Sequence, residues 1–340
     1  MTRVLLPPAR PLTYTLPVAA RTNEGSLMKM VSIVVPVYCE EAALASVFDR
    51  FQATFVDRSD YACFEFVFVD DGSTDESLRL LTEFASNEPR CRVVSLSRNF
   101  GHQAALLAGL MSARGDAVVA LDADLQDPPE LVHTMIERWT AGADIVHAQR
   151  RQRRGEHLVK RATAATFYRV INWLSETNLP RNVGDFRLMD RVVVDHLTAL
   201  SERSLYLRGM SAWLGFTQDT VEYDREPRVA GRTKYSMKKM IGLATDGILG
   251  FSEKPLRLVT RTGLVVTAIS FCWGMYLLGV VLFVDNRDLA GWPSLILTLL
   301  FLGGVQLTSL GIIGEYIGRI YRETKGRPLF IIDRRKSIDS

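Results

Sequence analysis

The chain has 340 residues, of which 47% are hydrophobic and 23% are charged, so it can form one large domain with an additional segment. Its net charge of +3 is too small to indicate a nucleic-acid partner. Its four cysteines show no CxxC spacing, which favours reduced, structural cysteines in a cytosolic compartment.

The first 29 residues differ in character from the rest of the chain. They contain four prolines, no clear periodicity and no long apolar core of the kind found in a signal peptide. We expect residues 1–29 to be a disordered N-terminal extension and the structured chain to begin at residue 30.

Short apolar runs then alternate with segments of helical periodicity. Residues that commonly begin helices precede the helical segments. One example is Asp127, a residue type favoured at helix N-termini, which is followed by two prolines, favoured in the first helical turn. Repeated strand and helix units of this length, joined by right-handed crossovers, predict an α/β domain with a doubly wound, mostly parallel sheet over residues 30–232. The expected strands are 32–37, 64–69, 93–96, 117–121 and 144–148.

Acidic residues follow three of these expected strands. Glu40 and Glu41 follow the first, Asp70 and Asp71 end the second, and the pair Asp122 and Asp124 ends the fourth. Because carboxyl ends of parallel strands share one edge of a sheet, where ligands bind, the three clusters are expected to converge. The last pair is placed to hold a divalent cation, while the second pair has an alternative role beside a helix N-terminus.

The last third of the chain is predicted to meet a membrane. Apolar residues between 234 and 251 fall on one helical face, which predicts interfacial amphipathic helices over 233–260, with a core helix of the soluble domain as the alternative. Residues 262–284 and 289–314 contain no charged residue, and each stretch exceeds the roughly 20 residues that cross a bilayer. We therefore expect a hairpin of two transmembrane helices within 261–318.

Basic residues flank this predicted hairpin on both outer sides. By the positive-inside rule, both flanks face the cytoplasm, so the domain over 30–232 and a basic tail over 319–340 are expected to be cytoplasmic. Small residues in the second span would allow close helix packing within one protomer or in a homo-oligomer. The flanking residues are Lys254, Arg257, Arg261, Arg319, Arg322, Lys325 and Arg327.

Several segments together resemble the GT-A fold, family 2 glycosyltransferases, and among these the polyprenyl-phosphate glycosyltransferases, with bacterial undecaprenyl-phosphate (bactoprenol) glucosyltransferases as the nearest resemblance. With the two-span tail, the resemblance covers residues 31 to about 330. The matching segments are 34–40 (VVPVYxE), 70–75 (DDGSTD), 97–101 (SRNFG), 122–129 (DADLQDPP), 185–188 (DFRL) and 228–235 (RxxGxxKY).

This resemblance implies a donor site for a nucleotide-sugar on a GT-A (Rossmann-like) sheet. Its metal would be Mg²⁺ or Mn²⁺, because a hard divalent cation can neutralise the charge that develops on the leaving diphosphate. The implied metal ligands are Asp124, Asp122 and Gln126. The residues implied for nucleotide-sugar binding are Pro36, Tyr38, Glu40, Asp71 and Asp122.

The acceptor implied by the resemblance is a lipid phosphate. Its phosphate would contact Arg187, Arg228 and Lys234, and Asp185 is the candidate base. An alternative for Asp185 is an ion pair that only braces Arg187 or Arg191. We interpret His102, at a predicted helix start, as a structural or donor-lining histidine, because this displacement needs no histidine.

These features predict a multi-pass, inverting glycosyltransferase of the bacterial inner membrane. It would transfer glucose from UDP-glucose to undecaprenyl phosphate on the cytoplasmic face, with bilayer lipid as a further partner. Alternatives are another UDP-sugar (N-acetylglucosamine, galactose or an amino-arabinose) or GDP-mannose, since residue spacing does not separate the sugars. A processive polysaccharide synthase is less expected because the chain lacks a Gln-x-x-Arg-Trp motif, and a catalytically silent nucleotide-binding scaffold because the acidic clusters are intact.

Overall fold

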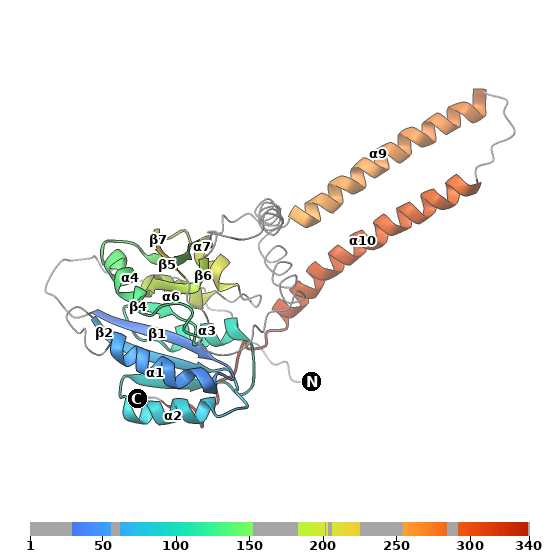
Figure 1. The fold of residues 1–340 in the computed structure, drawn as a ribbon. Helices are drawn as coiled ribbons and strands as arrows, with labels where there is room; N and C mark the ends of the chain where they lie inside the picture. The colour runs from blue at the N-terminus through green and yellow to red at the C-terminus, as the bar shows by residue number, and fades with distance from the viewer. Residues whose placement is uncertain are drawn as a thin grey trace, which may run out of the picture.

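The computed structural model describes residues 29–55, 62–151, 183–200, 202, 206–224, 254–283 and 292–338. Its described part contains a seven-stranded sheet with helices on both faces (Figure 1). The strands are β1 (Lys29–Val37), β2 (Ala62–Asp70), β3 (Cys91–Ser95), β4 (Ala117–Ala120), β5 (Ile145–Arg150), β6 (Val183–Asp190) and β7 (Gln218–Tyr223). The helices are α1 (Glu41–Phe55), α2 (Ser77–Asn87), α3 (His102–Ser112), α4 (Leu131–Thr140), α6 (Arg191–Ala199), α7 (Leu207–Trp213), α9 (Lys254–Phe283) and α10 (Trp292–Thr324).

The strand order is β3-β2-β1-β4-β6-β5-β7. The first four of these strands run parallel to one another, and β5 pairs in parallel with β7. One strand, β6, lies antiparallel between β4 and β5. The five predicted strands correspond to β1 through β5, and the prediction of a mostly parallel sheet with helices on both faces is confirmed. The strands β6 and β7 were not predicted.

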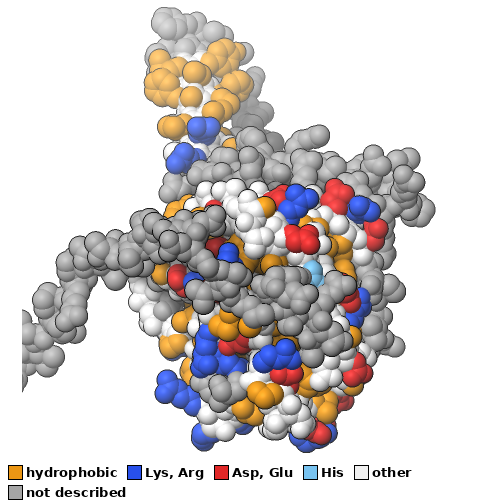
Figure 2. Space-filling view, turned by 90° about the vertical axis from the view of Figure 1, so that its left-hand side faces the viewer, with side chains coloured by type: hydrophobic (Ala, Val, Ile, Leu, Met, Phe, Trp, Pro, Cys, Tyr) orange, Lys and Arg blue, Asp and Glu red, His pale blue; other side chains and the backbone are white. Residues whose placement is uncertain are grey.

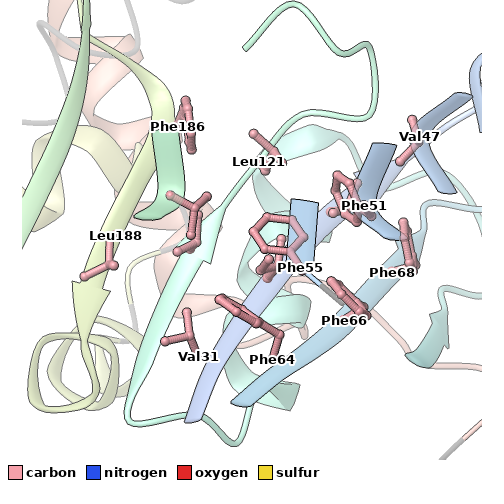
Figure 3. Close-up of a cluster of buried hydrophobic side chains, with 14 of the residues drawn as sticks. Val31, Val47, Phe51, Phe55, Phe64, Phe66, Phe68, Leu121, Phe186 and Leu188 are labelled. Carbon is pink, nitrogen blue, oxygen red and sulfur yellow. The ribbon is translucent and has the colours of Figure 1, made fainter. Parts of the chain in front are cut away.

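Alternate residues of the central strands pack on opposite faces of the sheet. Ile33 faces a core formed with α1, α2 and α4, whereas its neighbour Val34 faces a core formed with α3, α6 and α7. On the first face, Phe51 of α1 stacks near Phe66 and Phe68 of β2, with ring centroids 5.7 and 6.0 Å away (Figure 3). Each such buried side chain stabilises the fold by about 1.5–3 kcal/mol, so both faces of the central strands are firmly fixed.

Two long helices, α9 and α10, run beside each other away from the sheet (Figure 1). In the part of the chain that the structure describes, Leu256–Tyr276 is long and apolar enough to cross a membrane. Large apolar side chains on both helices are exposed, such as Phe271 at 69% and Leu307 at 72%. In Figure 2, the described side chains on the part of the molecule that extends away from the sheet domain, called the projection below, are mostly apolar. Exposed apolar surface of this extent indicates contact with lipid or a partner.

The boundaries of this projection differ from the predicted ones. Residues 254–260, predicted as interfacial, form the first turns of α9, and α10 continues to Thr324, beyond the predicted end at 318. The rest of the predicted interfacial segment and residues 1–28 lie outside the described residues.

Beyond α10, the tail returns to the sheet and pairs with the edge strand β3. Antiparallel bridges join Val93 to Ile338 and Leu96 to Ile332. Backbone hydrogen bonds from Val93 N to Ile338 O (3.0 Å) and from Ile338 N to Val93 O (2.8 Å) close one of them. The tail therefore covers an edge that would otherwise expose unpaired backbone groups, and it ties α10 to the sheet.

We expect Ile338→Asp to lower the free energy of unfolding by about 2 kcal/mol, because Ile338 packs against the core and a carboxylate there would be partly desolvated. Denaturant unfolding of the detergent-solubilised protein, followed by tryptophan fluorescence, measures this change. The control is Arg335→Ala in the same tail, whose side chain is 89% exposed and should change stability by less than about 0.5 kcal/mol. Equal stability of the two variants would contradict a packed tail.

Candidate active site

Three acidic clusters meet at one edge of the sheet, as predicted, because β1, β2 and β4 are adjacent and parallel. Backbone hydrogen bonds link the ends of these strands. Asp71 N, after β2, donates to Val37 O of β1 at 2.9 Å, and Leu121 N, after β4, donates to Val34 O of β1 at 3.0 Å. The carboxyl ends of these strands thus bring segments distant in sequence to one place.

The turn after β4 carries Asp122 and Asp124 in a tight conformation. Leu125 adopts a φ of +53°, an uncommon value for a residue with a side chain. The backbone N–H of Gln126 donates to Asp124 Oδ1 at 3.1 Å, which closes the turn. Asp127 is buried and holds the turn against the sheet, because it accepts hydrogen bonds from Tyr223 of β7 and from Arg150 of β5 (3.5 Å).

Asp185 faces this turn because β6 runs antiparallel to β4. Ala120 pairs with Arg187, and continuing this register by two residues brings Asp122 opposite Asp185. Asp185 Oδ1 accepts from Arg187 at 3.2 Å and from Arg208 of α7 at 3.3 Å. Its Oδ2 accepts from Gln103 of α3 at 3.1 Å. Both oxygens are therefore held by donors from three different elements.

His102 joins the two facing carboxylates. Its Nε2 lies 3.3 Å from Asp185 Oδ2 and 3.7 Å from Asp122 Oδ1, and 40% of its side chain is exposed. The sequence interpretation of a structural or donor-lining histidine did not include this contact with both carboxylates. The position of His102 at the first residue of α3, directly after the matched segment 97–101, was the available signal.

The charges in this cluster change one another's protonation. Burial raises the pKa of Asp122 to about 6, with Asp185 adding to the effect and His102 opposing it. Burial lowers the pKa of His102, but the hydrogen bond to Asp185 and the two carboxylate charges outweigh it and raise that pKa to about 9. Burial also acts to raise the pKa of Asp185, yet His102, Arg208 and Arg187 together hold it well below its usual range. At neutral pH, the cluster therefore contains an imidazolium and an ionised Asp185.

Arg187 and Arg208 differ in their access to a ligand. Arg187 is 1% exposed and donates to Asp185, to Ser211 Oγ (2.6 Å) and to Leu207 O (3.5 Å). This burial argues against the predicted contact between Arg187 and an acceptor phosphate. Arg208, which sequence reasoning missed, is 28% exposed at the same carboxylate. The other two predicted phosphate contacts, Arg228 and Lys234, lie outside the described residues.

The Asp70–Asp71 pair supports the loops around the predicted donor site. Asp71 accepts from Phe100 N (2.7 Å) and Gly101 N (2.9 Å) at the start of α3, so it braces that helix. Asp70 is 1% exposed and accepts from Ser73 N at 3.1 Å. A Cβ at Gly72 would lie 2.4 Å from the backbone of Arg98, and its φ of +66° also favours glycine. Nucleotide binding by Asp71 stays a prediction.

The other predicted nucleotide contacts lie at the end of β1. Pro36 is buried and pairs with Val69 of β2, so its side chain has a packing role. Tyr38 is 39% exposed, and the backbone N–H of Glu40 donates to Ser77 Oγ at 3.0 Å. Of these three residues, the most exposed at this edge is therefore Tyr38.

The donor atoms near Asp124 suit a hard divalent cation. Asp124, Asp122 and Gln126 supply carboxylate and amide oxygens, which Mg²⁺ and Mn²⁺ prefer. Among the described residues, no group of three His, Cys, Asp or Glu side chains is arranged to hold a metal alone. This donor set would therefore need oxygens from a bound diphosphate or water to complete the coordination.

Comparison with known proteins follows the same division of the chain. Residues 32–198 match Glycosyl transferase family 2, and residues 254–320 match the GtrB C-terminal hairpin. The uncharacterized glycosyltransferase YkcC of Bacillus subtilis is 45% identical over 91% of this chain and 95% of its own length. The bactoprenol glucosyl transferase of Shigella phage SfV is 45% identical over 90% and 99%, respectively, and the prophage bactoprenol glucosyl transferase homolog of Escherichia coli K12 is 43% identical over 90% and 99%. The chain therefore belongs to glycosyl transferase family 2 and carries the GtrB C-terminal hairpin.

Proposed function

We propose that this glycosyltransferase transfers glucose from UDP-glucose to undecaprenyl phosphate, with inversion at the anomeric carbon. One observation carries the proposal: Asp122, at the carboxyl end of β4, faces Asp185, which forms ion pairs with Arg187 and Arg208. The domain that contains this pair is joined to an apolar helical hairpin. The names of the phage and E. coli relatives, aligned over nearly their full length, support the sugar and the lipid.

On the donor side, the proposed nucleotide-sugar contacts are Tyr38, Glu40, Asp71 and Asp122, with Pro36 shaping the end of β1. Asp124, Asp122 and Gln126 would hold Mg²⁺ or Mn²⁺, which would neutralise charge on the departing UDP. The tight turn at Leu125 supports this role, because it keeps the two aspartates of the turn on a short, fixed segment.

On the acceptor side, an oxygen of the lipid phosphate would attack the anomeric carbon while the bond from that carbon to UDP breaks. The phosphate is already anionic at neutral pH, since its second pKa lies near 6 by analogy with phosphorylated side chains, so little help from a base is needed. The low pKa of Asp185 makes it a weak proton acceptor. We therefore assign Asp185 to holding the surrounding cations in place for the acceptor.

The hairpin would keep the active site beside the lipid phosphate. We propose that α9 and α10 both cross the inner membrane and that the sheet domain is cytoplasmic. The basic residues at the outer ends of both helices support this orientation. Since the acceptor tail stays in the bilayer, its phosphate would reach the sheet domain at the headgroup level.

Membranes that contain the protein are expected to convert undecaprenyl phosphate into a product heavier by one hexose when UDP-glucose is added. Mass spectrometry of extracted lipid, with a panel of nucleotide-sugars, measures this conversion and identifies the sugar. The control is the same membrane with Asp124→Asn protein. A product formed only from another donor would change the proposed sugar, and no lipid product from any donor would refute the proposed reaction.

A further inference from the structure

The acceptor phosphate needs a cation that it can reach, and Arg187, Arg208 and Arg150 each donate to Asp185 or to the turn after β4. Arg187 is fully buried, and its guanidinium donates to groups of the protein. Arg150 donates to Tyr223 Oη at 3.0 Å and to Asp127 at 3.5 Å, and no contact with Asp185 is recorded for it among the described residues. Arg208 remains as the partly exposed arginine that contacts Asp185 itself.

Two hydrogen bonds fix the direction of the Arg208 side chain. Its Nη1 donates to Val183 O at 2.9 Å, and its Nη2 donates to Asp185 Oδ1 at 3.3 Å. Its Nε is buried and has no hydrogen-bond partner among the described residues. A guanidinium has five N–H donors in a planar fork, so Arg208 is held in place while it retains donors for another oxyanion.

We propose, on the basis of the proposed function, that Arg208 is an acceptor-binding residue that donates to the phosphate monoester of the lipid. Asp185 can share Arg208 with this phosphate, because it also accepts from Arg187, Gln103 and His102. Binding of the acceptor therefore leaves no buried carboxylate unpaired.

Solvent access separates the two arginines that contact Asp185. Arg187 and Arg208 both donate to Asp185 Oδ1, at 3.2 and 3.3 Å. Solvent reaches the side chain of Arg208, which is 28% exposed, whereas that of Arg187 is 1% exposed. Of these two arginines, Arg208 is therefore the one that an incoming anion can contact.

The test compares Arg208→Ala, Arg208→Lys and the control Arg191→Ala in the full-length, detergent-solubilised protein. Arg191 is matched in exposure, at 27%, but it lies at the opposite end of β6 and donates to Gly115 O and Ala113 O. We expect Arg208→Ala to raise the KM for undecaprenyl phosphate by about 10- to 100-fold, the size of a lost charged hydrogen bond, and to leave the KM for UDP-glucose within about twofold. Arg208→Lys should recover part of this loss because it keeps the charge without the fork.

Thermal unfolding and direct lipid binding make the outcome unambiguous. Native mass spectrometry with undecaprenyl phosphate and no donor should show weaker binding to a folded Arg208→Ala protein than to the wild type or Arg191→Ala. Equal lipid binding, or an equal rise in both KM values, would overturn the role of Arg208. If the wild type binds the lipid phosphate but transfers no sugar, the proposed function fails while the binding comparison still tests Arg208.

Discussion

Replacing Asp124 by asparagine is expected to lower glucosyl transfer by about 10²- to 10³-fold with little change in stability. Asparagine keeps the oxygen that accepts from Gln126 N, so the turn after β4 should persist. The variant loses the negative charge that would hold a divalent cation against the leaving diphosphate, and losses of this size follow removal of one group that stabilises transition-state charge. Initial rates of lipid glucosylation, measured over a series of Mg²⁺ and Mn²⁺ concentrations, test this expectation.

A matched control lies at the other end of the same strand. Asp116 precedes β4 and accepts a hydrogen bond from Met30 N at 2.8 Å, so Asp116→Asn makes the same chemical change away from the active site. Its transfer rate should stay within about threefold of the wild type, as for a surface change of less than about 0.5 kcal/mol. Full turnover by a folded Asp124→Asn protein in excess metal would show that the metal assignment is wrong.

The sequence was informative where strands are mostly apolar. The run at Ala117–Ala120 is apolar throughout, and the other four predicted strands are largely buried and apolar apart from single polar residues such as Glu65 and His147, so their composition indicates strands buried on both faces. By contrast, β6 contains Asp185 and Arg187, and β7 alternates polar residues along the sheet edge. Charged residues normally indicate a loop, and only the packing of α7 against β6 shows why an arginine is buried there.

Some residues of the candidate site could be predicted from the sequence, and others could not. The carboxyl-end rule predicted that Asp71 and Asp122 would converge, because it requires only parallel neighbouring strands. It could not predict the facing of Asp122 and Asp185, which depends on an antiparallel strand inserted beside β4. Nor could it find Arg208, which reaches Asp185 from a helix 23 positions later. The pairing of Ile338 with Val93 is equally invisible in local sequence, because it joins β3 to a segment more than 240 positions later in the chain.

Asp185 has two separable roles, one in stability and one in reaction. The buried guanidinium of Arg187 relies on this carboxylate for charge compensation, and Arg208 shares it. Removing one partner of a buried ion pair costs about 3–5 kcal/mol, whereas replacing both partners by uncharged groups is often close to neutral. A loss of activity in a single Asp185 variant therefore does not by itself distinguish a reacting group from a structural one.

A double-mutant cycle separates these roles. We expect Asp185→Asn to lower the free energy of unfolding by about 3 kcal/mol, because Arg187 would remain charged and uncompensated in the interior. The double variant Asp185→Asn/Arg187→Met should recover at least about 2 kcal/mol of this loss, since no buried charge is then unpaired. Glucosyl transfer should stay at least about 10²-fold below the wild type in both variants, because the carboxylate that orients His102 and Arg208 is absent. Denaturant unfolding and initial rates, measured on the same preparations, give both quantities. Recovery of transfer together with stability would assign Asp185 to bracing Arg187 alone.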